Sequence, residues 1–170
     1  GEPTLHPDFG GVVDDVIVLR NKYYPSVKIS VLSNSTMIDR PAVAEALLKV
    51  DNNILKLDSA VDATMRLIDR PANKEFTVEH VVGHLKKFRH QCIVQTMMVR
   101  GEHDGVRIDN TTDAEIQALL KAYLEIEPAE VMLYSLDRPT PEQRLQKVER
   151  DELERIAEVF RQKGIKVQVN

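Results

Sequence analysis

The sequence predicts an α/β fold: a partial barrel of about five parallel strands, with the helices on the outer face of the sheet. The first observation is that apolar residues switch repeatedly between a strand period and a helix period. The second is that an amphipathic helix separates each strand-like segment from the next, which implies right-handed crossovers and parallel strands. The third is that no repeat, linker or low-complexity segment interrupts this order. We therefore predict that residues 1–170 form one domain.

Short segments with the apolar alternation or the apolar run of a β-strand recur along the chain. The first carries Val27, Ile29 and Val31 between polar neighbours. The third is largely apolar, as is typical of a strand buried on both faces. The predicted strands are residues 26–36, 53–60, 91–99, 130–137 and 165–169.

Helical periodicity fills the intervals between these strands. Pro41 lies at a first helical turn, Thr77 opens a further helix, and Gly164 ends the last one. Two polar stretches rich in glycine or proline, residues 100–112 and 138–150, are predicted to be loops. The predicted helices are residues 8–24, 41–50, 61–69, 77–88, 113–126 and 151–163.

The composition is that of a globular protein. Of the 170 residues, 42% are hydrophobic and 29% are charged, which argues against disorder. The net charge of -4 argues against a dedicated nucleic-acid surface, since phosphate binding depends on clustered lysine and arginine. No apolar run approaches the ~20 residues that span a bilayer, so we expect no membrane contact. The single cysteine, Cys92, excludes an internal disulfide framework and suits a reducing, cytoplasmic location.

Polar residues gather where the predicted strands end. Ligands of parallel α/β folds bind at the carboxyl ends of the strands. Ser33 and Asn34 follow the first apolar run, Asp58 follows the second, and Gln95 lies toward the end of the third. These positions favour a polar small-molecule site. Lys56 alternates with Asp58, so both side chains are expected to point into the barrel.

The first nine residues, "GEPTLHPDF", resemble the glycine-glutamate motif that follows the second barrel strand in the radical S-adenosylmethionine (radical SAM) superfamily. The chain is similar to that superfamily along its whole length. The stretches "LKLDSA" and "LYSLDRPTPE" are similar to iron–sulfur oxidoreductases related to wyosine-base synthases and to activating enzymes of glycyl radical enzymes. The resemblance implies a partial TIM-type barrel whose full-length enzyme uses S-adenosylmethionine and a metal-binding [4Fe–4S] site. That enzyme would cleave S-adenosylmethionine reductively and start radical chemistry on an unknown substrate.

The resemblance also implies which residues bind the cofactor. In the superfamily, backbone groups of the glycine-glutamate turn bind the methionyl amino group, which points here to Gly1, Glu2 and Pro3. Polar side chains at the ends of the following strands bind the ribose and the carboxylate. The positions that match in this chain are Ser33, Asn34, Asp58 and Gln95.

The chain departs from the superfamily in its cysteines. The defining Cys-x3-Cys-x2-Cys loop lies upstream of the glycine-glutamate turn, whereas the only cysteine here is Cys92. One thiolate cannot hold a [4Fe–4S] cluster. We therefore expect the chain to be a fragment of a longer enzyme, inactive alone, with neither cofactor bound and no metal or catalytic residue of its own. Its first strand would be an open edge, from which we expect self-association or disorder of residues 1–10.

Two other functions stay open. One is a barrel-like binding domain with no redox role, in which the opening motif is coincidental. The other is a lysine-dependent aldolase or isomerase barrel, in which burial lowers the pKa of Lys56 and lets it form imines. The partner also stays open, since the substrate could be a small molecule, an RNA or a protein.

Histidines provide two weaker candidates. His80 and His84 have the i, i+4 spacing of helical zinc ligands, but no glutamate follows His80, and solvent-side helix histidines are the simpler interpretation. His103 and Asp104 lie in a glycine-bounded stretch at the expected rim of the barrel, where a solvated loop is the simpler interpretation.

Overall fold

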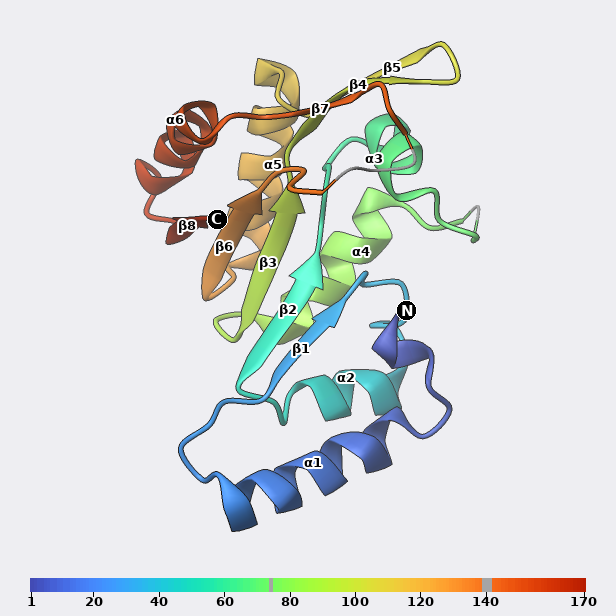
Figure 1. Ribbon diagram of the computed structural model, residues 1–170, viewed down its shortest axis with the longest axis vertical. Helices are drawn as coiled ribbons and strands as arrows, with labels where there is room; N and C mark the ends of the chain where they lie inside the picture. Colours follow the sequence, from blue (N-terminus) through green and yellow to red (C-terminus); the bar gives the residue numbers. More distant parts are fainter. Residues whose placement is uncertain (74, 139–141) are drawn as a thin grey trace.

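The centre of the molecule is a parallel sheet of five strands in the order β1-β2-β3-β6-β8, which confirms the predicted fold class (Figure 1). The computed structural model describes residues 1–73, 75–138 and 142–170. Neighbouring strands are parallel, with Lys56 opposite Gln95 and Met97 opposite Tyr134. The strands are Ser30–Ser33 (β1), Asn52–Lys56 (β2), Cys92–Met97 (β3), Glu130–Tyr134 (β6) and Val167–Val169 (β8).

Helices occupy the connections between these strands, close to the predicted limits. Helix α1 (Phe9–Tyr23) begins after Asp8, whose carboxylate accepts a hydrogen bond from the Gly11 N–H at 3.1 Å. Helix α5 (Asp113–Ile126) has the predicted limits, and its N-cap hydroxyl accepts from the N–H three residues on. The remaining helices are α2 (Pro41–Leu47), α3 (Asp62–Asp69), α4 (Val78–Leu85), α6 (Arg150–Arg161) and the 3-10 turns η1 (Pro3–Leu5) and η2 (Lys86–Phe88).

The helices cover one face of the sheet and leave the other open. Along β3 and β6 every second side chain is buried, and those between them, such as Gln95 and Tyr134, are partly exposed. On the buried face Val94 and Leu133 belong to one core with Tyr123 of α5, and α4 and α5 lie behind the sheet in Figure 1. The prediction that the third strand is buried on both faces is therefore wrong, because the described helices cover only one of them.

A second, antiparallel sheet of three strands, in the order β5-β4-β7, lies beyond the carboxyl end of β3. Its strands are Val99–His103 (β4), Val106–Asp109 (β5) and Leu145–Lys147 (β7). Both predicted loops, residues 100–112 and 138–150, are thus wrong in part, since each contains strand. The part of the second predicted loop at residues 139–141 lies outside the described residues.

Two local features explain this sheet. Asp104 and Gly105 have φ values of 49° and 77°, and such a left-handed pair forms the two-residue turn of a β-hairpin. At Gly101, where φ is 139°, an added Cβ would collide with the backbone of Arg144. Glycine at that position therefore lets β7 approach β4 closely enough to pair with it.

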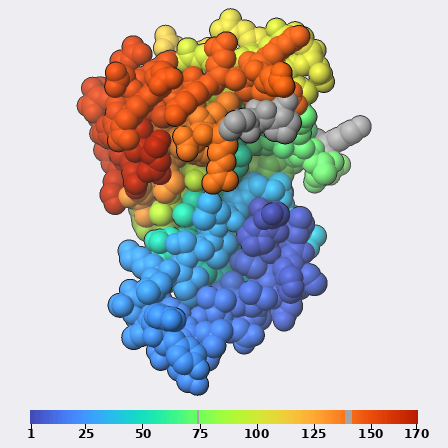
Figure 2. Space-filling view, viewed as in Figure 1, coloured from blue at the N-terminus to red at the C-terminus, as the bar shows by residue number. Residues whose placement is uncertain are grey.

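The N-terminal segment lies against the edge strand β1. In Figure 2 the first residues (dark blue) lie near the middle of the visible face, between the β4–β5 hairpin (yellow) at one end of the molecule and the blue segment that includes α1 at the other. Residues 1–10 form η1 and the start of α1, so the expected disorder of this segment is not seen. Strand β1 is an edge of the sheet, as expected, and self-association through it stays a prediction. Among the described residues, no helix is both long and apolar enough to cross a membrane.

Candidate functional site

A pocket of about 310 Å³ opens on the uncovered face of the sheet, at the carboxyl ends of β1, β2, β3 and β6. This volume lies at the lower end of the range of ligand pockets, about 300–1,000 Å³. Of the residues that the resemblance implies, only Asp58 does not line it. The lining residues are Gly1, Glu2, Pro3, Leu32, Ser33, Asn34, Lys56, Gln95 and Tyr134. The structure therefore brings the N-terminal turn and the strand ends together in one place.

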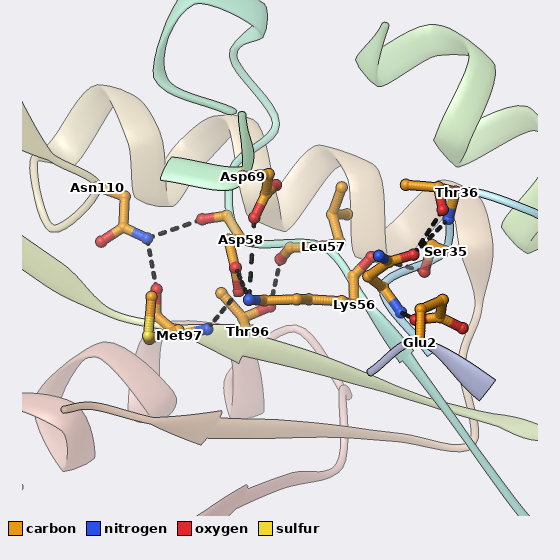
Figure 3. A network of polar contacts seen from close by, with 11 residues as sticks. Glu2, Ser35, Thr36, Lys56, Leu57, Asp58, Asp69, Thr96, Met97 and Asn110 are labelled. Carbon is orange, nitrogen blue, oxygen red and sulfur yellow. Dashed lines mark hydrogen bonds and ion pairs between the residues drawn. The ribbon is translucent and has the colours of Figure 1, made fainter. Parts of the chain in front are cut away.

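Glu2 holds the N-terminal turn against the end of β1. Its Oε2 accepts a hydrogen bond from the Asn34 N–H at 2.7 Å, and its Oε1 accepts from the Thr4 N–H at 3.1 Å (Figure 3). A carboxylate that accepts two backbone N–H groups is held firmly, because such charge-assisted bonds are stronger than neutral ones. The Glu2 side chain thus shapes the turn, and residues 1–3 of the turn line the pocket.

The loop after β1 is stiffened by its own side chains. Asn34 Oδ1 accepts from the backbone N–H and the hydroxyl of Thr36, at 3.0 and 2.7 Å. Ser33 is buried and accepts from the Ser35 N–H at 3.1 Å, while the Ser35 hydroxyl donates to the carbonyl of Lys56 at 2.8 Å. Ser35 has a φ of 65°, a left-handed conformation that these bonds sustain. The loop is thereby tied to β2 beside the pocket.

Lys56 lies on the pocket wall and reaches toward two carboxyl groups (Figure 3). Its Nζ is 2.7 Å from Asp58 Oδ2 and 3.9 Å from Asp69 Oδ1. Asp58 has no exposed side-chain surface, and its other oxygen accepts from the Met97 N–H at 2.7 Å. Both oxygens of Asp58 are therefore engaged, so in this structure its contribution to the pocket is to hold Lys56.

Gln95 and Tyr134 complete the floor of the pocket. Gln95 lies opposite Lys56 on β3, and its amide nitrogen is 3.5 Å from the Met132 sulfur. Burial, together with the nearby carboxylate of Asp58, raises the pKa of Tyr134, so its hydroxyl stays protonated and can donate a hydrogen bond. Lys56, Gln95 and Tyr134 thus present an ammonium, an amide and a hydroxyl on neighbouring strands.

The hypothesis of an imine-forming lysine fails on the direction of the pKa shift. Burial, the largest single effect, lowers the pKa of Lys56, but the combined effects of Asp58, Tyr134 and Asp69 outweigh it and raise the pKa above its ordinary value. An imine-forming lysine needs a lowered pKa, since only the neutral amine is nucleophilic. The expectation of a lowered pKa is therefore wrong, because it counted burial without the buried carboxylate 2.7 Å away.

Asn110, which no sequence pattern singled out, holds the segments at the rim of the site together. It is fully buried, and its Nδ2 donates to the carbonyls of Asp58 and Met97, both at 2.7 Å. Its Oδ1 accepts from the Val99 N–H at 2.8 Å. An asparagine between a strand and a helix N-cap is typical of a turn, so the pattern carries no sign of this role.

The chain's own residues do not fit an iron–sulfur cluster. Cys92 is buried, and burial raises the pKa of its thiol to about 12, whereas a cluster ligand must be a thiolate. In the described part of the chain, no three His, Cys, Asp or Glu side chains are placed to hold a metal ion. The rings of His80 and His84 on α4 are in contact, with centroids 4.5 Å apart and planes tilted by 56°.

Replacing Asp69 with asparagine is expected to change how stability depends on pH. Burial and the nearby Asp58 carboxylate raise the pKa of Asp69 from 3.8 to about 8. The folded state then holds a proton that the unfolded state releases, so this contribution to stability is full below pH 3.8 and is lost as the pH rises to about 8. In the Asp69→Asn variant, the free energy of unfolding should no longer fall over this pH range for this reason.

Urea unfolding of both proteins from pH 4 to 9 measures the effect. The exposed Asp15→Asn variant is the matched control and should keep the wild-type slope. An Asp69→Asn protein whose stability falls with pH as steeply as the wild type would show that Asp69 is not protonated in the fold.

Comparisons with known proteins find relatives of low sequence identity. No family model matches the chain. A "UPF0026 protein" of Helicobacter pylori (strain 26695) is 25% identical over 82% of this chain and 42% of its own length, and one of Synechocystis sp. is 29% identical over 85% and 50%. The GTPase Obg of Brachyspira hyodysenteriae is 24% identical over 94% of this chain but 22% of its own length. The chain thus spans half or less of the curated relatives it matches.

Solved structures with a similar fold include enzymes and a domain of an enzyme. A domain of pyruvate-formate lyase-activating enzyme from Bacteroides vulgatus matches with a TM-score of 0.67 and 14% identity, over 100% of this chain and 94% of that one. A radical SAM methyltransferase from Sphaerobacter thermophilus matches at 0.68 and 20%, over 100% and 48%. Streptococcus suis SuiB bound to S-adenosylmethionine matches at 0.70 and 14%, over 100% and 38%. At these identities the likeness establishes the fold alone.

Proposed function

We propose that this chain is the S-adenosylmethionine-binding part of a radical SAM iron–sulfur oxidoreductase. The observation that carries the proposal is the pocket, in which the Gly1–Glu2–Pro3 turn meets the ends of four strands on the open face of a partial barrel. The fold likeness to SuiB bound to S-adenosylmethionine supports it. Bound S-adenosylmethionine supplies the deoxyadenosyl group of such an enzyme when a cluster reduces it.

The chain's residues fit the polar groups of that cofactor. The turn fixed by Glu2 offers backbone acceptors for an ammonium group, and the amide oxygen of Gln95 can accept from a ribose hydroxyl. The Asn34 oxygen already accepts two bonds from Thr36, so Asn34 can instead donate from its amide nitrogen to a ribose oxygen. Lys56 and Tyr134 provide donors for a carboxylate on the same floor. The cluster does not fit, so we propose that its ligands lie in a longer polypeptide and that the chain alone is inactive in radical chemistry.

Calorimetric titration of the chain with S-adenosylhomocysteine, which needs no cluster to remain intact, tests the proposal. Because the pocket is formed within this chain, we expect saturable binding, in place of the expectation from sequence that the chain binds neither cofactor. Gln95→Ala should weaken binding about 3- to 10-fold, because one net hydrogen bond contributes about 0.5–1.5 kcal/mol. Asn34→Ala should weaken it similarly. Gln168→Ala is the matched control, since Gln168 is exposed on β8 and does not line the pocket. No binding at millimolar ligand, or equal binding by all three variants, would reject the proposal.

A binding domain with no redox role remains the second candidate, favoured by the buried, protonated Cys92. The two candidate functions differ in whether 5′-deoxyadenosine is formed. A longer polypeptide that carries this chain, reconstituted with iron and sulfide and reduced, should form 5′-deoxyadenosine if the first proposal holds. If the chain binds S-adenosylhomocysteine but that polypeptide forms no 5′-deoxyadenosine, the second candidate holds.

A further inference from the structure

A second cavity, of about 200 Å³, lies between α3 and the small antiparallel sheet. Most of its wall is apolar: Leu67 comes from α3, Met97 and Val99 from the end of β3 and the start of β4, Ile108 from β5 and Leu145 from β7. Val99 and Ile108 are buried, so this wall is a firm part of the fold. The hairpin that the sequence did not predict therefore builds one side of the cavity.

This cavity adjoins the first pocket. Asp69 lines the second cavity and lies 3.9 Å from the Nζ of Lys56, which lines the first. Gln95 lines the first pocket and Met97 lines the second cavity. They lie two residues apart on one face of β3, which corresponds to about 6.6 Å along a strand. A ligand in the second cavity would therefore lie within a few ångströms of a ligand in the first.

The volume of the second cavity limits what it can take. An apolar cavity of about 150 Å³ is large enough to bind benzene. At about 200 Å³, this one accommodates a single ring with a small substituent. It is too small for a nucleoside or a whole cofactor.

The charges at the mouth of the cavity satisfy one another. Glu142 Oε1 accepts from Arg70 at 3.2 Å, Glu142 Oε2 lies 2.6 Å from His103 Nδ1, and His103 Nε2 lies 3.1 Å from Asp104. These polar contacts join α3 to the hairpin. A charged ligand group would enter without a counterion of its own and lose its hydration, so the cavity favours an uncharged group.

We propose that the second cavity binds a single uncharged aromatic ring of the substrate, next to S-adenosylmethionine in the first pocket. This inference rests on the proposed function, because the second cavity lies beside the reacting cofactor only if S-adenosylmethionine binds in the first pocket. It assigns His103 and Asp69 to the surroundings of the substrate, whereas the sequence favoured a solvated loop for His103.

An NMR titration with phenol as the probe tests this, with the methyl groups of methionine, valine, isoleucine and leucine labelled with carbon-13. The largest saturable shifts are expected at Met97, Val99 and Ile108. Ile108→Trp fills the cavity and should raise the Kd for phenol at least about 10-fold. Val106→Trp should leave the Kd for phenol unchanged. Val106 lies on the same strand, but it is 46% exposed and does not line the cavity.

Ile108→Ala gives a second test that does not depend on a bulky side chain fitting into the fold. It enlarges the cavity, so 2-naphthol should gain affinity relative to phenol. The inference is overturned if phenol shows no saturable shifts, or if neither change at Ile108 alters its binding. If either of these results is found while S-adenosylhomocysteine still binds, only this inference fails. If phenol binds and S-adenosylhomocysteine does not, the proposed function fails.

Discussion

Asp58→Ala is expected to lower the free energy of unfolding by about 3–5 kcal/mol, the usual cost of breaking a buried ion pair from one side. The Asp58 carboxylate is 0% exposed and pairs with Lys56 at 2.7 Å. Its loss leaves the Lys56 ammonium and the Met97 N–H without their partner. Urea unfolding monitored by circular dichroism measures the change.

The exposed ion pair between Asp14 and Lys49 is the matched control. Its N–O distance is also 2.7 Å, but its side chains are 56% and 46% exposed, so Asp14→Ala should cost under about 1 kcal/mol. The double variant Asp58→Leu with Lys56→Met should recover most of the lost stability, since an apolar pair can replace a buried ion pair. Equal losses in Asp58→Ala and Asp14→Ala would contradict the role given to Asp58.

Asn110→Ala is expected to lower the free energy of unfolding by about 3 kcal/mol. The change removes three side-chain hydrogen bonds and leaves the Val99 N–H and the carbonyls of Asp58 and Met97 buried without this partner. Each buried polar group left unsatisfied costs about 1–3 kcal/mol. Thermal and urea unfolding measure the loss.

Asn52→Ala serves as the control for Asn110. The Asn52 amide donates one bond, to Ser30 at 2.9 Å, at the opposite end of the sheet and in an exposed setting. Its removal should cost less than about 1 kcal/mol. If the two asparagine variants lose the same stability, Asn110 does not hold the rim as described.

The parallel sheet and its helices could be predicted because their signals are local. Helix α5 has both an N-cap threonine and a long apolar stripe within its own 14 residues, and its limits were predicted without error. The strands of the parallel sheet were predicted at the correct places but with too many residues. After β1, for example, polar residues continue the chain without pairing to the neighbouring strand. Gly1, Glu2, Ser33, Asn34 and Gln95 meet at one pocket because parallel strands end on one edge.

What the sequence could not predict depends on contacts between distant segments. Strand β7 has three residues and pairs with β4, more than forty positions earlier, so no local period marks it. The hairpin did carry a signal, since Asp104-Gly105 is a strong turn pair, but the polar composition around it favoured a loop. The burial of Asp58 and the raised pKa of Lys56 both follow from tertiary neighbours rather than from the strand itself.

The most direct test of the account is a map of backbone amide shifts when S-adenosylhomocysteine is added to the chain labelled with nitrogen-15. The account predicts that the largest shifts occur at Glu2, Asn34, Lys56, Gln95 and Tyr134, which line the pocket, and that residues of α1 and β8 stay unchanged. Shifts that gather elsewhere on the molecule, or no shifts at millimolar ligand, would contradict it.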